Sequence, residues 1–126
     1  RAARRIPSPL AAIKDIRLEK VKLYHRKDEQ IWIEIIAVIT EDKRLVIKGN
    51  DSGKLVKKLR SNWDYEYYIE LESIDLVNLI EKTGNNHVRM SEILIWLKEN
   101  YEGPEVFSRI KKLLQSLDVR YKESYW

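Results

Sequence analysis

The segment WDYEYYIELE, residues 63–72, alternates strictly between two sets of positions. The two sets are Trp63, Tyr65, Tyr67, Ile69 and Leu71, and Asp64, Glu66, Tyr68, Glu70 and Glu72. Successive side chains of a β-strand point to opposite sides of the sheet. The pattern therefore predicts a strand with one buried aromatic face and one acidic face.

Four more segments have the character of strands, namely residues 13–25, 31–40, 44–49 and 119–126. In the first, the apolar residues shift from even-numbered to odd-numbered positions, which would place them on opposite faces of a regular strand. A bulge at Glu19–Lys20 would return them to one face. The second is apolar on both faces, with Trp32, Ile36 and Val38 on the second. Such a strand is typically central in a sheet or covered on both sides.

Four segments have helical spacing of apolar residues: 54–60, 73–82, 90–101 and 103–117. We expect Asp51 or Ser52 to cap the first helix. The apolar stripes include Leu55, Val56 and Leu59 in the first helix, and Ile74, Val77 and Ile80 with Leu76 and Leu79 alongside in the second.

The predicted order is β-β-β-α-β-α-α-α-β. It indicates an α+β fold, with a mostly antiparallel sheet of about five strands and three to four helices on one side. Residues 13–126 are expected to form one domain. Residues 1–12 contain two prolines and a basic cluster, which indicates a flexible lead-in or a remnant left by cloning.

The net charge comes mainly from the first residues. The chain has 24 Lys and Arg against 20 Asp and Glu, a formal charge of +4. Without Arg1, Arg4 and Arg5 the counts are 21 against 20, so the rest of the chain is close to neutral. A phosphate-binding domain normally carries a clustered positive face. The overall charge therefore does not favour a nucleic-acid partner.

The chain contains no cysteine, which excludes disulfides, a thiolate nucleophile and cysteine-ligated metal centres. This fits a reducing compartment, and we expect a cytoplasmic protein. The longest apolar stretch, residues 31–39, is far shorter than the roughly 20 residues that cross a bilayer. We expect neither a secretory signal nor contact with a membrane.

No catalytic motif is complete. The segment KGNDSGK, residues 48–54, lacks the glycine spacing and the hydroxyl residue of a phosphate-binding loop. The EDK triplet at residues 41–43 falls in a predicted hairpin turn. His25 and His87 are far apart in predicted polar turns, and neither has the spacing of a zinc site. We expect no cofactor, no metal and no catalytic residue.

Two kinds of surface remain as candidates. The acidic positions 64–72 could bind a cation or perform acid–base chemistry, but cross-strand ion pairs with basic neighbours explain the same pattern. Basic helix faces could contact phosphates through Lys54, Lys57, Lys58 and Arg60, or through Arg109, Lys111 and Lys112. Such runs are also the ordinary solvent-exposed side of an amphipathic helix.

Aromatic residues are predicted on the polar side of the sheet as well. Tyr68, Trp126 and Trp32 fall opposite the buried positions. Aromatic side chains surrounded by charges are typical of a protein-binding surface, although a covering helix would also explain them. The predicted partner-binding residues are Asp64, Glu66, Tyr68, Glu70 and Trp126.

The segments DYEYYIEL, LVNLIEKTG, FSRIKKLLQSLDVRY and ESYW resemble a group of small, uncharacterised bacterial proteins. Those proteins share an Asp/Glu-Tyr-Glu-Tyr strand and an aromatic Ser-Trp-like ending, and the resemblance covers about residues 44–126. It implies a bacterial cytosolic origin and no established activity.

Three functions follow from these observations. The leading one is a non-enzymatic protein-binding module, similar in action to an immunity protein or antitoxin that occludes its partner. The alternative is a nucleic-acid-associated protein that uses the basic helix faces. The third is an enzyme whose Glu or Asp and His residues are brought together by the fold.

Overall fold

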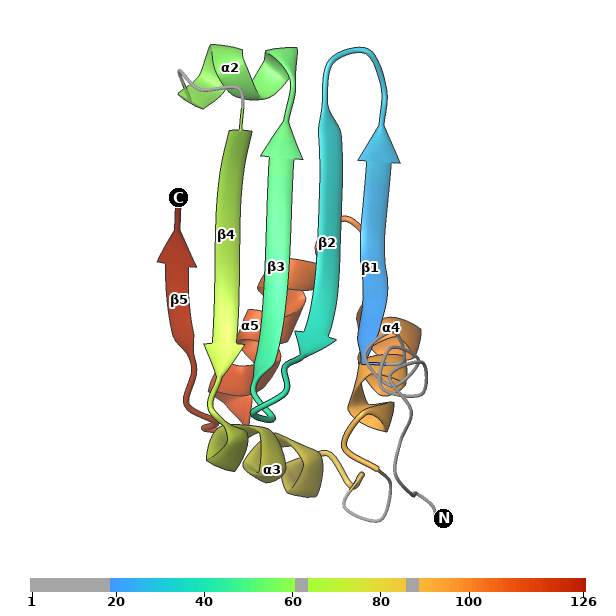
Figure 1. Ribbon diagram of the computed structural model, residues 1–126, viewed down its shortest axis with the longest axis vertical. Coiled ribbons are helices and arrows are strands. Elements are labelled where there is room, and N and C mark those ends of the chain that lie inside the picture. Colours follow the sequence, from blue (N-terminus) through green and yellow to red (C-terminus); the bar gives the residue numbers. More distant parts are fainter. Residues whose placement is uncertain (1–18, 61–63, 86–88) are drawn as a thin grey trace.

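The computed structural model describes residues 19–60, 64–85 and 89–126. The elements are β1 (Lys20–Lys27), β2 (Trp32–Ile39), β3 (Leu45–Ser52), α2 (Lys54–Arg60), β4 (Asp64–Leu71), α3 (Ser73–Lys82), α4 (Glu92–Tyr101), α5 (Val106–Ser116) and β5 (Lys122–Tyr125). Figure 1 shows their arrangement. The predicted α+β fold and the predicted order of elements are confirmed. Residues 1–12, the predicted lead-in, lie outside the described residues.

The five strands form one sheet in the order β1-β2-β3-β4-β5, and all four neighbouring pairs are antiparallel. β1, β2 and β3 follow one another through short turns, as local antiparallel pairing favours. The chain then places three helices between β4 and β5 before it returns to the edge of the sheet (Figure 1).

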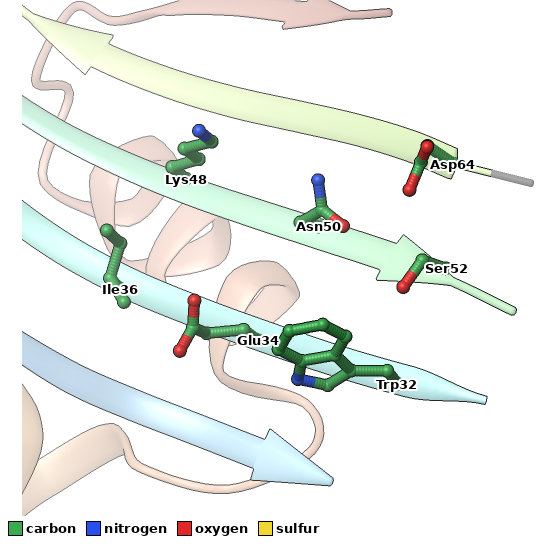
Figure 2. Close-up of a pocket in the computed structure, with 7 residues that line it drawn as sticks. All are labelled: Trp32, Glu34, Ile36, Lys48, Asn50, Ser52 and Asp64. Carbon is green, nitrogen blue, oxygen red and sulfur yellow. The ribbon is translucent and has the colours of Figure 1, made fainter. Parts of the chain in front are cut away.

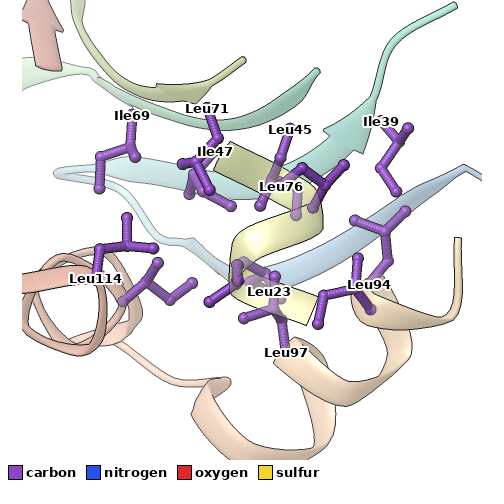
Figure 3. Close-up of a cluster of buried hydrophobic side chains, with 14 of the residues drawn as sticks. Leu23, Ile39, Leu45, Ile47, Ile69, Leu71, Leu76, Leu94, Leu97 and Leu114 are labelled. Atoms are coloured by element: carbon purple, nitrogen blue, oxygen red, sulfur yellow. The ribbon is translucent and has the colours of Figure 1, made fainter. Parts of the chain in front are cut away.

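The helices bury one face of the sheet. α4 and α5 lie behind the strands, α3 lies across one end, and α2 lies at the other end (Figure 1). Figure 3 shows the resulting core, in which the alternate residues of the strands meet the helix stripes. Ile47, Ile69 and Leu71 from the sheet and Leu97 and Leu114 from the helices are all fully buried. Burying one such side chain contributes about 1.5–3 kcal/mol.

The irregularity in β1 lies at a different residue from the one expected. Val21 pairs with Ala37 and Tyr24 pairs with Ile35, so Leu23 is the extra residue of the bulge. The bulge directs Val21, Leu23 and Tyr24 to the core side together. The expected site at Glu19–Lys20 is therefore wrong, and the residues before 19 are outside the described part of the chain.

Two helix predictions also need correction. Asp51 and Ser52 do not cap α2, because they are the last residues of β3 and pair with β2 and β4. In α3, Ile74 and Val77 are 64% and 38% exposed, while Asp75 is buried. α3 is apolar around most of its circumference, and contact with the sheet selects the side formed by Leu76, Leu79 and Ile80.

In α2, Val56 is buried but Leu59 is 72% exposed. The predicted stripe of α2 is therefore only partly in contact with the rest of the protein. Two turns of helix at the end of the sheet have little surface to pack against, which leaves the second turn in solvent.

Candidate functional site

The face of the sheet opposite the core has no helix over it in the described part of the chain (Figure 1). We call it the uncovered face. Its residues follow from the alternation in each strand and from the register between strands. They are Lys20, Lys22, His25 and Lys27 from β1, Trp32, Glu34, Ile36 and Val38 from β2, Val46, Lys48, Asn50 and Ser52 from β3, Asp64, Glu66, Tyr68 and Glu70 from β4, and Lys122, Ser124 and Trp126 from the chain around β5.

All five predicted partner-binding residues lie on this face. β5 pairs with β4, and Trp126 exchanges two backbone hydrogen bonds with Glu66, of 3.1 and 2.8 Å. This pairing places the Trp126 side chain beside that of Glu66, and Trp126 is 78% exposed. The pairing of β4 with β5 thus brings Trp126 next to the acidic strand, although the two are far apart in the sequence.

The carboxylates of β4 differ in their environment. Glu70 accepts a hydrogen bond of 3.0 Å from Arg44 Nη1, the kind of cross-strand ion pair expected on a solvated sheet. Glu66 accepts a hydrogen bond from the Tyr68 hydroxyl at 2.6 Å and a longer one from Asn50. The side chain of Asp64 forms no hydrogen bond or ion pair with another described residue. Asp64 is thus the carboxylate of β4 that is free to meet a partner.

Tyr68 lies at the centre of the acidic strand. Its hydroxyl donates to Glu66, and this hydrogen bond raises the pKa of Tyr68 to about 12. On the neighbouring strand, Lys48 Nζ lies 5.9 Å from the centre of the Tyr68 ring. Tyr68 is therefore a neutral, positioned aromatic group, and it has no features of an acid–base catalyst near neutral pH.

The uncovered face contains a shallow hollow of about 310 Å³. Figure 2 shows that β2, β3 and β4 line it. The lining residues are Trp32, Glu34, Ile36, Lys48, Asn50, Ser52 and Asp64. Glu34, Asn50 and Ser52 were not among the predicted residues, because only the strand register places them beside Asp64. Trp32 was predicted on this side of β2 from the alternation of residues 31–40.

The hollow is bordered on the β1 side by basic residues. Lys27 Nζ lies 5.5 Å from the centre of the Trp32 ring, and Lys22 Nζ lies 3.6 Å from Glu34 Oε2. Trp32 is 47% exposed despite its size. An exposed aromatic ring between charged strands can supply apolar contact area while its neighbours orient an incoming surface.

The basic helix faces lie elsewhere. Lys54, Lys57 and Lys58 are exposed on α2, at the end of the sheet, and the side chain of Arg60 lies outside what the structure describes. On α5, Lys111 donates a 3.0 Å hydrogen bond to Glu123. Arg109 lies 4.9 Å from the centre of the Tyr101 ring. The two predicted basic groups therefore do not form one continuous surface.

Of the two histidines, the structure describes only His25. His25 is not in a turn, because it lies within β1 and pairs with Glu34, and His87 is outside the described residues. Within residues 19–60, 64–85 and 89–126, no group of three His, Cys, Asp or Glu side chains has the geometry to hold a metal ion. The EDK triplet lies in the β2–β3 turn, where Lys43 has a φ of 64°.

A second hollow, of about 450 Å³, lies along the exposed side of α3. Ile74, Val77 and Glu81 line it together with Asp75, whose carboxylate accepts a 3.2 Å hydrogen bond from Arg120 Nε. Asp75 is buried and already paired, and His25 is not among the residues that line this hollow. Its groups do not form a catalytic set.

Comparison with known proteins gives no relative: no family model, no curated protein and no solved structure matches this chain. None of the helices described here is both long enough and apolar enough to cross a membrane.

Proposed function

We propose that this chain is a non-enzymatic protein-binding module that engages its partner through the uncovered face. The observation that carries the proposal is the group of exposed and half-buried apolar side chains on that face, outside the core. Monomeric proteins rarely expose contiguous apolar surface, and where they do it commonly marks an interaction site.

The composition of the face fits a protein partner. Trp32, Tyr68 and Trp126 are aromatic residues of the types enriched in binding hot spots. Lys22, Glu34, Arg44 and Glu70 already form ion pairs around them. Such charged surroundings steer encounter and select the partner, while the aromatic rings provide the buried area.

The sheet also keeps this face in its binding conformation before any partner arrives. Each of β2, β3 and β4 is paired on both sides, so their backbones are held by the ladder hydrogen bonds. A preorganised surface loses little conformational entropy on association. The action that follows is occlusion, in which the rigid face covers a functional surface of the partner, as immunity proteins and antitoxins do.

We place this function in the cytoplasm of a bacterium. The absence of cysteine agrees with a reducing compartment. The resemblance of residues 44–126 to small bacterial proteins supports the same assignment.

The test is capture of the partner from a lysate of the source cell by tagged protein. Asp64→Lys combined with Glu66→Lys should reduce partner recovery strongly, because two reversed charges within an interface cost about 2 kcal/mol or more. The matched control is Glu81→Lys combined with Glu99→Lys, which makes the same charge change on exposed parts of α3 and α4.

One stoichiometric protein that the wild type and the control retain, and that the first variant loses, is the expected result. Equal recovery by all three proteins would exclude this face. Recovery of nucleic acid that salt releases would instead favour the basic helices, and Lys57→Glu with Lys58→Glu should then reduce the salt dependence.

A further inference from the structure

The uncovered face has its opposite charges on two different strands. β1 presents only basic or neutral side chains there, and β4 presents acids with a single tyrosine between them. The two sets are Lys20, Lys22, His25 and Lys27, and Asp64, Glu66, Tyr68 and Glu70. Two strands, β2 and β3, separate these sets. Within β1 to β4 the face is therefore basic on one side and acidic on the other, and Lys122 of β5 lies beyond the acidic strand, beside Glu70.

The strands between the two charged sets carry the aliphatic residues of the face. Val38 of β2 is directly paired with Val46 of β3, and Ile36 is one step along β2 on the same side. All three are half-buried with no helix over them in the part of the chain that the structure describes. An apolar centre between a basic and an acidic strand is a pattern that can complement itself.

We propose that a second copy of this chain covers the uncovered face, related to the first by a two-fold axis that runs parallel to the strands between β2 and β3. This rotation places β1 of each copy over β4 of the other and β2 over β3. The two sheets would stack about 10 Å apart with their strands nearly aligned, as in a β-sandwich.

The register determines which residues would meet across the axis. Lys20, Val38, Val46 and Glu70 form one continuous row across β1 to β4, and Lys122 of β5 continues the row at the edge of the sheet. In the proposed dimer, Lys20 therefore faces Glu70 of the other copy, and Val38 faces Val46. Opposite charges meet on both sides of the axis, and aliphatic residues meet beside it.

A second row contains two exposed charges at its ends. It consists of Lys27, Trp32, Ser52 and Asp64. Neither Lys27 nor Asp64 forms an ion pair with another described residue, although Lys27 lies near the Trp32 ring. The rotation places Lys27 over Asp64 of the other copy. It does so twice, because the symmetry repeats the contact.

The area is sufficient for a dimer of modest affinity. The four facing strands each have eight residues. At about 3.3 Å per residue and about 4.8 Å between strands, the four strands cover a flat area of roughly 500 Å² on each copy. Protruding side chains add to this area. Two such faces approach the lower limit of a specific interface, about 1,000–1,200 Å² in total.

The inference goes beyond the proposed function, because it concerns the protein in the absence of any partner. Dimer formation and partner binding would use the same face and would therefore compete. The two proposals can also fail separately, since self-association is measured on the pure protein and partner binding is not.

The first measurement is sedimentation velocity of the full chain over about two orders of magnitude in concentration. We expect a reversible change from monomer to dimer. Lys27→Asp and Asp64→Lys, each alone, should weaken self-association at least about tenfold, because each places two pairs of like charges in the interface. Glu99→Lys on α4 is the control and should leave it unchanged.

The second measurement mixes the two single variants in equal amounts. In a mixed dimer, both charge pairs are again of opposite sign, so the mixture should form heterodimers with nearly wild-type affinity. This recovery is specific to a two-fold contact between positions 27 and 64. Circular dichroism should show that both variants keep the fold, since both substituted side chains are exposed.

Three results would overturn the proposal. They are a wild type that sediments as a monomer at every concentration, single variants that dimerise as strongly as the wild type, and a mixture that stays as weak as its components. A monomer whose uncovered face is nevertheless protected from labelling would point to coverage by another segment of the same chain.

Discussion

At Gly49 the backbone of β3 passes directly beneath the ring of Tyr67, its cross-strand neighbour on β4. The strand expected at residues 44–49 ends three residues later than expected, because β3 continues past Gly49 to Ser52. The Tyr67 hydroxyl donates a 2.7 Å hydrogen bond to Asp51, and its ring packs edge-on against Phe107 at 4.8 Å between centroids. Burial and the bond to Asp51 both raise the pKa of Tyr67. Glycine is needed here because a side chain would occupy the space of the ring.

Gly49→Ala should therefore destabilise the protein. The added methyl group would overlap the Tyr67 ring, and displacing a well-packed ring typically costs about 1–3 kcal/mol. Urea unfolding measures the change. Asn50→Ala is the control, because Asn50 is the next residue on β3 and points to the uncovered face. A Gly49→Ala protein as stable as the control would contradict the packing described here.

A second residue-scale prediction concerns pH. Glu123 accepts hydrogen bonds from the Tyr125 hydroxyl and from Lys111 Nζ, and these interactions lower the pKa of Glu123 below its ordinary value of 4.5. Below pH 4.5 the unfolded chain therefore binds this proton before the folded protein does. The stabilisation is complete above pH 4.5 and is lost as the pH falls through the lowered pKa.

Glu123→Gln should make the free energy of unfolding less dependent on pH below about 4.5, since the substituted residue does not titrate. Chemical denaturation at several pH values measures this slope for both proteins. Equal slopes would show that Glu123 is not held in its charged form.

At the scale of elements, α4 shows how the helices select the core side of the sheet. Leu97 and Leu94 are fully buried, and α4 packs mainly on β1. Two hydrogen bonds add to the contact between α4 and β1. Lys98 Nζ donates to the Lys22 carbonyl at 3.0 Å, and the Gly103 amide donates to the Leu23 carbonyl at 3.1 Å. These bonds occupy part of the outer edge of β1, which would otherwise present free backbone groups.

Leu97→Ala should cost about 2–5 kcal/mol, because it leaves a cavity between α4 and the sheet. Ile95→Ala, on the same helix, is the matched control, since Ile95 is 53% exposed. Its effect should remain within about 0.5 kcal/mol. Thermal or urea unfolding distinguishes the two, and similar losses would mean that α4 does not hold β1 in place.

At the scale of the whole molecule, the alternation of residues 64–71 and 31–39 was enough to predict which side chains share a face. It could not give the register, because the partner of each strand depends on contacts distant in sequence. For the same reason the bulge at Leu23 and the row linking Trp32 to Asp64 appear only in the structure. In α3, apolar residues occur on two sides of the helix, and the sequence does not show which side packs against the sheet. The structure buries the side with Leu76, Leu79 and Ile80.

The candidate site was only partly predictable. The aromatic residues on the polar side of the strands indicated a surface, while a covering helix remained an equal explanation. The fold decides that point for the described residues, because α3, α4 and α5 all pack on the other side or at the end (Figure 1). The apolar second side of β2 predicted a strand that is central in the sheet or covered on both sides. β2 is central, between β1 and β3, and no helix of the described residues covers its second side.

The most direct test of the account is the labelling of single cysteines, since the chain has none of its own. Ser52→Cys places a thiol in the hollow of the uncovered face, and Ser108→Cys places one on the exposed side of α5. Alkylation rates would be measured on dilute protein, on concentrated protein and with the captured partner. We predict that partner binding slows labelling at position 52 strongly and leaves position 108 unchanged. Equal rates at position 52 with and without the partner would contradict the assignment of the uncovered face as the binding surface.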